Sequence, residues 1–103
     1  MYIERFTYSP AMGKGRELRA LVEERMNKAQ AQGREVSVSI PVFGDGVGSV
    51  VVTLRFNDLV EFEKRRAQNK TDKDVQEFVG KVTSFIASVK VELLEVLIPF
   101  SSK

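Results

Sequence analysis

Residues 36–56 read VSVSIPVFGDGVGSVVVTLRF, and this stretch determines which fold the rest of the chain can adopt. Apolar residues alternate with small or polar ones on both sides of a glycine-rich segment, with the period of two that is typical of strands with one buried face. The central FGDGVG, residues 43–48, carries three glycines, which readily adopt the positive φ that tight turns require. The stretch predicts a β-hairpin with strands over 36–42 and 49–56.

The residues before the hairpin predict one strand and one helix. Residues 2–8 are rich in β-branched and aromatic side chains, as strands are, and Pro10 and Gly13 then mark a loop. A helix is expected from Arg16 until Gly33 ends it, because the apolar residues between them recur at helical spacing. These apolar positions are Leu18, Leu21, Val22, Met26 and Ala29.

The residues after the hairpin predict a broken helix and a last strand. Asn57 and Asp58 are expected to supply the cap of a helix over 59–69, and Thr71, with Asp74 three residues later, to cap a second helix. The last strand is expected over 91–100. The apolar stripe of the second helix is expected to comprise Val75, Phe78, Val79, Val82, Phe85, Ile86 and Val89.

The element order is therefore βαββαβ, which predicts a single α+β domain over residues 1–103. Two crossovers and one hairpin make the ferredoxin-like split βαβ fold, whose antiparallel sheet has the order 4-1-3-2. Proline cannot donate to a strand ladder and belongs on edge strands. Pro41 and Pro99 fall on the two predicted edge strands, in agreement with this order.

The two faces of this sheet are expected to differ in what covers them. One face is almost entirely apolar and should pack on the helices. The other mixes bulky apolar residues with hydroxyls and charges, and an exposed apolar patch of that size marks an interface or a ligand cavity. We expect the helix-packed face to include Leu94, Val96 and Ile98 of the last strand, and the second face to include Ile3, Arg5, Thr7, Val51, Thr53, Arg55, Leu93, Glu95 and Leu97.

Composition excludes several kinds of chemistry. The 103 residues contain no cysteine and no histidine, which rules out thiolate and imidazole metal ligands, cysteine nucleophiles and a Ser-His-Asp triad. We expect no metal and no cofactor. A formal charge of +2 is too small to indicate nucleic acid or an anionic membrane as a partner. Neither a transmembrane helix nor a signal peptide is predicted, and a cytoplasmic location is expected by default.

Three charged side chains of the second face are the strongest candidates for a site. Arg5, Arg55 and Glu95 would lie on adjacent strands, where two guanidiniums would attract an anionic ligand and a buried Glu95 could act as a base. The alternative is an internal ion-pair network that fixes the register of a dimer. Thr53 is a further candidate ligand contact. Tyr8 and Tyr2 could donate hydrogen bonds at the mouth of a pocket, although such tyrosines more often serve packing.

The chain resembles the dimeric α+β barrel superfamily, and within it the NIPSNAP and antibiotic-biosynthesis-monooxygenase-like groups. Residues 4–24, ERFTYSPAMGKGRELRALVEE, are similar to the NIPSNAP start, and residues 56–79 are similar to its broken second helix with paired Arg65 and Arg66. The resemblance implies two ferredoxin-like sheets paired face to face in a homodimer. The superfamily's haem-degrading members and cofactor-free oxygenases rely on Trp and His, which this sequence lacks.

The expected function is binding of a small anionic or aromatic molecule in a cavity between the sheet and the helices of a homodimer. One alternative is a cofactor-independent monooxygenase or isomerase, in which Glu95 abstracts a proton and Arg5 or Arg55 stabilises the anion. Another is a purely structural or regulatory dimer. A cavity lined by unpaired polar groups would favour the first two possibilities.

Overall fold

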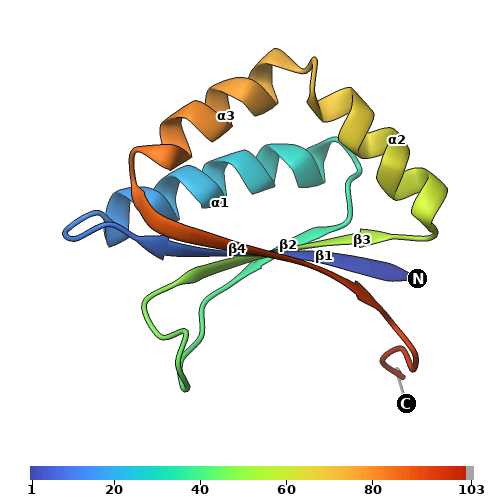
Figure 1. Cartoon of the computed structure of the whole chain (residues 1–103), viewed down its shortest axis with the longest axis horizontal. Coiled ribbons are helices and arrows are strands. Elements are labelled where there is room, and N and C mark those ends of the chain that lie inside the picture. Colours follow the sequence, from blue (N-terminus) through green and yellow to red (C-terminus); the bar gives the residue numbers. More distant parts are fainter. Residues whose placement is uncertain (102–103) are drawn as a thin grey trace.

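Four strands and three helices follow one another in the computed structural model, which describes residues 1–101 (Figure 1). Within these residues, no helix combines the length and the apolar character needed to cross a bilayer. The elements are β1 (Tyr2–Pro10), α1 (Gly15–Ala31), β2 (Val36–Ser39), β3 (Val50–Phe56), α2 (Leu59–Asn69), α3 (Lys73–Thr83) and β4 (Ile86–Glu95).

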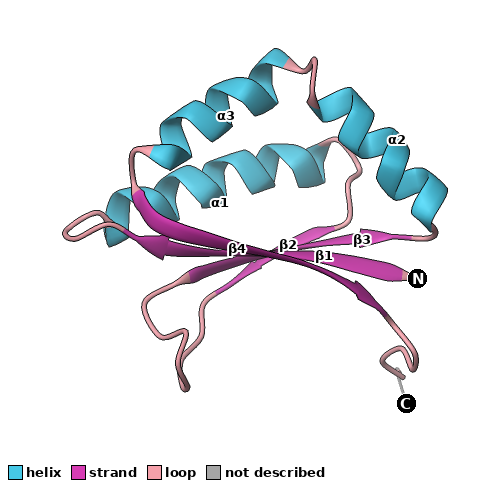
Figure 2. Ribbon diagram, in the orientation of Figure 1, coloured by secondary structure: helices cyan, strands magenta, loops and turns pink. Residues whose placement is uncertain are grey.

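The strands form one antiparallel sheet in the order β2-β3-β1-β4, which confirms the predicted ferredoxin-like arrangement. All three helices lie on one side of the sheet, and no helix covers the other side (Figure 2). Helix α1 packs on β2 and β3, α2 packs on β3, and α3 packs on α1. Strand β4 has β1 as its principal neighbour. The helix layer is therefore concentrated over the β2–β3 half of the sheet.

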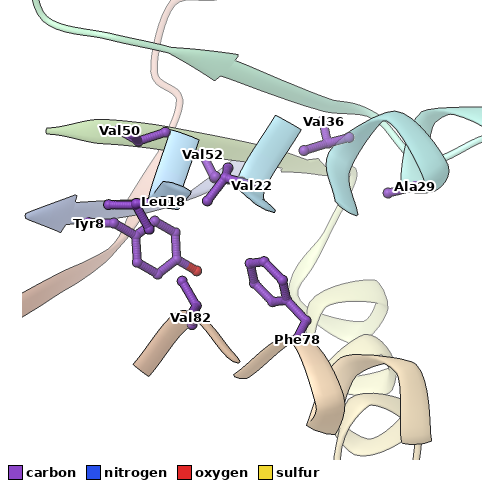
Figure 3. Packing of buried hydrophobic residues seen from close by; sticks show 9 residues of the cluster. All are labelled: Tyr8, Leu18, Val22, Ala29, Val36, Val50, Val52, Phe78 and Val82. Carbon is purple, nitrogen blue, oxygen red and sulfur yellow. The ribbon is translucent and has the colours of Figure 1, made fainter. Parts of the chain in front are cut away.

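The core lies between α1, α3 and the two central strands (Figure 3). Leu18 and Val22 of α1 and Val52 of β3 are fully buried. Burial of each such side chain contributes roughly 1.5–3 kcal/mol to stability, so these residues anchor α1 to the sheet. Phe78 and Val82 attach α3 to the same cluster.

The hairpin strand β2 is shorter than the alternation predicted. It ends at Ser39, and Ile40, Pro41 and Val42 belong to the connection to β3. Proline has no N–H to continue the ladder, so the chain leaves the sheet before Pro41. The Ser49 N–H donates to the Gly46 carbonyl at 2.9 Å, and Gly48 takes a φ of 97° as the connection returns to the sheet.

The break between α2 and α3 is present, but Asp72 caps α3 instead of the predicted Thr71. The Asp72 carboxylate accepts hydrogen bonds from the N–H groups of Asp74 and Val75, at 2.9 and 3.4 Å. The Thr71 hydroxyl donates to the Gln68 carbonyl at the end of α2. The cap of α2 at Asp58 is confirmed, because its carboxylate accepts from the Glu61 N–H at 2.8 Å.

Strand β4 begins five residues earlier than predicted and ends at Glu95. Its pairing with β1 places its side chains on the faces opposite to those predicted. Val91 lies opposite Phe6, and Val89 lies opposite Tyr8. Because Phe6 and Tyr8 pack into the core, Val89, Val91, Leu93 and Glu95 share the helix side of the sheet, and Leu94 lies on the opposite side. The predicted assignment of Leu93, Leu94 and Glu95 is therefore wrong. Val96, Ile98 and Pro99 lie beyond the strand.

Replacement of Asp72 by Ala should lower the free energy of unfolding by about 1 kcal/mol, because two N–H groups of the first turn of α3 lose their acceptor. Asp72→Asn retains a side-chain oxygen and should lose much less. Thr71→Ala should have a small effect, since the α2 carbonyl that loses its hydroxyl partner is exposed to water. Urea unfolding of the three variants measures these differences. A loss from Thr71→Ala as large as that from Asp72→Ala would contradict the assignment of the cap.

Candidate functional site

The side of the sheet without helices carries mostly polar side chains, and we call it the open face. In the centre, the Arg5 guanidinium lies 3.1 Å from the Glu92 carboxylate, and Thr53 occupies the register position beside Arg5. The open face comprises Ile3, Arg5, Thr7 and Ser9 of β1, Ser37 and Ser39 of β2, Val51, Thr53 and Arg55 of β3, and Ser88, Lys90, Glu92 and Leu94 of β4.

The structure assembles only part of the predicted charged trio. Arg5 and Arg55 lie on the open face as expected, but Glu95 lies opposite Tyr2 on the other side of the sheet. The carboxylate that contacts Arg5 is that of Glu92, three residues earlier. Arg55 contacts Glu35 at 3.3 Å, at the β2 edge. Arg5 and Arg55 thus pair with different carboxylates, and the second cation near Glu92 is Lys90, whose ammonium lies 4.0 Å from the Glu92 carboxylate.

Two hollows lie on the open face. The larger has a volume of about 670 Å³ and is lined by Arg5, Thr7 and residues of the β2–β3 connection. The smaller, of about 390 Å³, includes Ile3, Thr53 and Arg55 and is bordered by Phe100 of the C-terminal segment. The β2–β3 connection and the C-terminal segment both extend away from the helices on this side (Figure 1). Together they form the walls of a trough whose floor is the open face.

Tyr8, a predicted ligand contact, belongs to the opposite side of the sheet. Its ring is buried, lies nearly parallel to the Phe6 ring at a centroid distance of 6.0 Å, and points from β1 toward Val82 of α3 (Figure 3). Burial, together with the negative charge of Glu4, raises the pKa of Tyr8 to about 12. Tyr8 is therefore a protonated hydroxyl in the core and does not contact the open face.

The helix side of β4 carries an apolar surface that no helix covers. We call Val89, Val91 and Leu93 the β4 strip. Their exposed fractions are 45%, 54% and 42%, whereas Val50 and Val52 on the same side of β3 are 3% and 0% exposed. The contrast follows from the position of the helices over β2 and β3. On this side of the sheet, β1, β2 and β3 contribute side chains to the core, whereas the β4 strip is accessible.

Glu4 borders the β4 strip. Its register neighbours are Leu54 of β3 and Leu93 of β4, so the carboxyl lies among apolar side chains. Burial raises the pKa of Glu4, and the Arg66 guanidinium partly opposes this shift. Arg66 itself lies over the Phe62 ring, 5.7 Å from its centroid. A carboxyl that is held partly desolvated beside an accessible apolar surface can accept a proton from a bound ligand.

The sequence did not predict that Glu4, Arg66 and Glu92 contribute to a candidate site. The signal for Glu4 was its place in the alternating series Tyr2, Glu4, Phe6, Tyr8, where a carboxyl interrupts an aromatic face. Within the described chain, no group of three or more carboxylates could hold a metal ion.

The chain is similar to a known family and to several solved structures. The NIPSNAP family model matches residues 3–102. An uncharacterized NIPSNAP domain protein from Burkholderia xenovorans is 18% identical over 100% of this chain and 98% of that chain, with a TM-score of 0.77. A NIPSNAP family protein from Agrobacterium tumefaciens is 23% identical over 98% and 96%, with a TM-score of 0.78.

A candidate antibiotic biosynthesis monooxygenase from Deinococcus radiodurans has the same fold. It is 17% identical over 100% of this chain and 99% of that chain, with a TM-score of 0.73. No curated protein matches the chain. At these identities the solved structures support the fold, and the family model supports the family.

Replacement of Glu4 by Gln should stabilise the chain at neutral pH. The folded chain binds the Glu4 proton more tightly than the unfolded chain does, so the contribution of Glu4 to stability is greatest below the ordinary pKa of 4.5 and falls as the pH rises through the raised pKa. The advantage of Glu4→Gln should therefore disappear below pH 4.5. Denaturant unfolding of the wild type and of Glu4→Gln as a function of pH measures the difference in their free energies of unfolding.

Glu92→Gln is the matched control, because it breaks the half-exposed pair with Arg5. It should lower stability at neutral pH by at most about 1 kcal/mol. If Glu4→Gln also lowered stability at neutral pH, Glu4 would not be a desolvated carboxyl.

Proposed function

The chain belongs to the NIPSNAP family, and we propose that this member is a homodimer that binds a small aromatic molecule on the helix side of its sheet, along strand β4. The observation that carries the proposal is the β4 strip, where three apolar side chains of an edge strand remain accessible on the side of the sheet that carries the helices. Binding pockets are mostly apolar surfaces with a few polar groups that orient the ligand. The β4 strip with Glu4 at its border has this composition.

The polar groups around the β4 strip favour a ligand with a hydroxyl. Burial keeps the Glu4 carboxyl poorly solvated, so it gains from a donor such as a phenol. Arg66, whose charge acts on Glu4, supplies positive charge for the phenolate that would form if the proton moved to Glu4. A flat ring would lie on Val91 and Leu93 and exclude water from both.

The second candidate function is cofactor-independent chemistry on such a ligand. The raised pKa of Glu4 favours it, because a carboxylate with a higher pKa is a stronger base. Glu4 then takes the role of general base, which the sequence had suggested for Glu95. Glu95 lies at the exposed end of the same side of the sheet, where water solvates its carboxylate. The reaction class would be that of a monooxygenase or an isomerase.

We propose the open face as the dimer interface. Two segments with apolar side chains extend on its side of the sheet, away from the helices (Figure 1). They carry Val42, Phe43 and Val47 in the β2–β3 connection and Leu97, Ile98 and Phe100 in the C-terminal segment, all of them highly exposed. A second sheet packed on the open face would cover these side chains and would shield the Arg5–Glu92 pair from water. A purely structural dimer would use this interface without a ligand on the β4 strip.

Phenols should raise the unfolding temperature of the wild type, since a ligand that binds only the folded state stabilises it. Val91→Glu places a charge in the centre of the β4 strip and should abolish the shift. Val60→Glu on the exposed surface of α2 is the matched control and should retain it. Thermal unfolding with a panel of phenols and aromatic acids measures the effect. Equal shifts in both variants, or none in the wild type across the panel, would refute binding at the β4 strip.

The wild type should sediment as a dimer at micromolar concentration. Val51→Glu introduces a charge at the centre of the open face and should produce a monomer, whereas Val60→Glu should remain dimeric. Analytical ultracentrifugation of the three proteins measures their oligomeric states. If the wild type sedimented as a monomer, the open face would not be a dimer interface. The prediction of phenol binding would be unaffected.

A further inference from the structure

Three half-buried arginines lie near one another at the end of the helix layer where α1 meets the turn into β2. They are Arg25 of α1, Arg34 in the turn and Arg65 of α2. Within residues 1–101, neither Arg34 nor Arg65 has a carboxylate within ion-pair distance. By contrast, Arg5, Arg19 and Arg55 each contact a glutamate at 3.3 Å or less.

Arg34 and Arg65 line a small pocket with a volume of about 90 Å³. Both carboxylates in its wall already have partners. Glu35 contacts the Arg55 guanidinium at 3.3 Å, and Glu61 accepts a hydrogen bond from the Asn57 N–H at 3.2 Å. The pocket therefore presents the donors of two guanidiniums without matched acceptors. Its residues are Gly33, Arg34, Glu35, Leu54, Arg55, Phe56, Glu61 and Arg65.

The charges in this region repel one another. Burial lowers the pKa of Arg34, and the positive charges of Arg65 and then Arg25 lower it further. Asp72 opposes the shift, but it lies beyond ion-pair distance and caps α3. Arg34 also follows the C-terminus of α1, where a cation is favourable. That effect explains one cation in this position, but it does not explain why Arg65 faces the same pocket.

We propose that Arg34 and Arg65 bind the phosphate group of a small phosphate monoester in this pocket. A phosphate monoester carries a charge of about −1.5 to −2 at neutral pH. The pocket would attract it, because the charges of its three arginines exceed those of Glu35 and Glu61. The planar fork of an arginine side chain donates two parallel hydrogen bonds to phosphate oxygens. The pocket has room for the phosphate group, and the organic part of the ligand extends into solvent.

This site goes beyond the proposed binding of an aromatic molecule and is separate from it. The pocket is formed by the α1–β2 turn, the end of β3 and α2, whereas the β4 strip lies on the opposite edge strand of the sheet. Failure of one proposal therefore leaves the other unaffected.

The test is a titration in which inorganic phosphate replaces chloride at constant ionic strength. Binding is measured as the unfolding temperature of the protein and as the ³¹P line width of the phosphate. Wild-type protein should show a concentration-dependent rise in unfolding temperature and a broadened ³¹P line. Arg34→Gln and Arg65→Gln should each weaken binding by about tenfold or more, which is the effect of losing one charge-assisted hydrogen bond.

Arg16→Gln is the matched control, because Arg16 is an exposed arginine outside the pocket, and it should behave as the wild type. Methyl phosphate should compete with inorganic phosphate. Three results would overturn the proposal: an equal thermal shift with chloride alone, equal phosphate binding by the Arg34→Gln and Arg65→Gln variants, or binding to vesicles of anionic phospholipid without binding of free phosphate.

Discussion

The pairing of β4 with the central strand β1 determines which side of the sheet each β4 side chain occupies. Side chains alternate between the faces of a strand, so a shift of the register by one residue would exchange the two sets. The observed register places Arg5 opposite Glu92 and Phe6 opposite Val91. Its one irregularity within the described strands lies between Ser9 and Pro10, where β1 ends and β4 begins. The assignment of each β4 side chain to the open face or to the β4 strip depends on this pairing.

The break in the second crossover leaves the β4 strip accessible. In a ferredoxin-like fold, one continuous helix over β1 and β4 would bury Val89, Val91 and Leu93. Here α2 ends at Asn69, Asp72 begins α3 in a new direction, and α3 packs on α1. An edge strand with exposed apolar residues is an aggregation hazard unless something covers it. A ligand on the helix side and a second copy on the open face would together cover both sides of β4.

The strands and helices with unambiguous patterns were predictable from the sequence. Strict alternation defined the hairpin strand β3, helical spacing and Gly33 defined α1, and Asp58 defined the start of α2. These elements were sufficient for the sheet order. Arg5, Thr53 and Arg55 were also placed correctly on the open face, because β1 and β3 each have one unbroken alternating series.

The last strand was not predictable in the same way, because its sequence contains two alternating apolar series. Val89, Val91 and Leu93 form one series, and Leu94, Val96 and Ile98 form the other, with a change of phase at the Leu93–Leu94 pair. Phe85 and Ile86 also continue the helical spacing of α3, which concealed the start of the strand. The choice of the second series placed Glu95 beside Arg5 and overlooked Glu92. Only the pairing with β1, a contact between distant parts of the chain, distinguishes the two series.

The register of β4 can be measured directly by nuclear Overhauser contacts between the two strands in solution. The observed register predicts contacts of Phe6 with Val91 and of Arg5 with Glu92, which place Val91 and Leu93 on the helix side of the sheet. Contacts shifted by one residue, with Arg5 opposite Leu93, would move Val89, Val91 and Leu93 to the open face and would contradict the account.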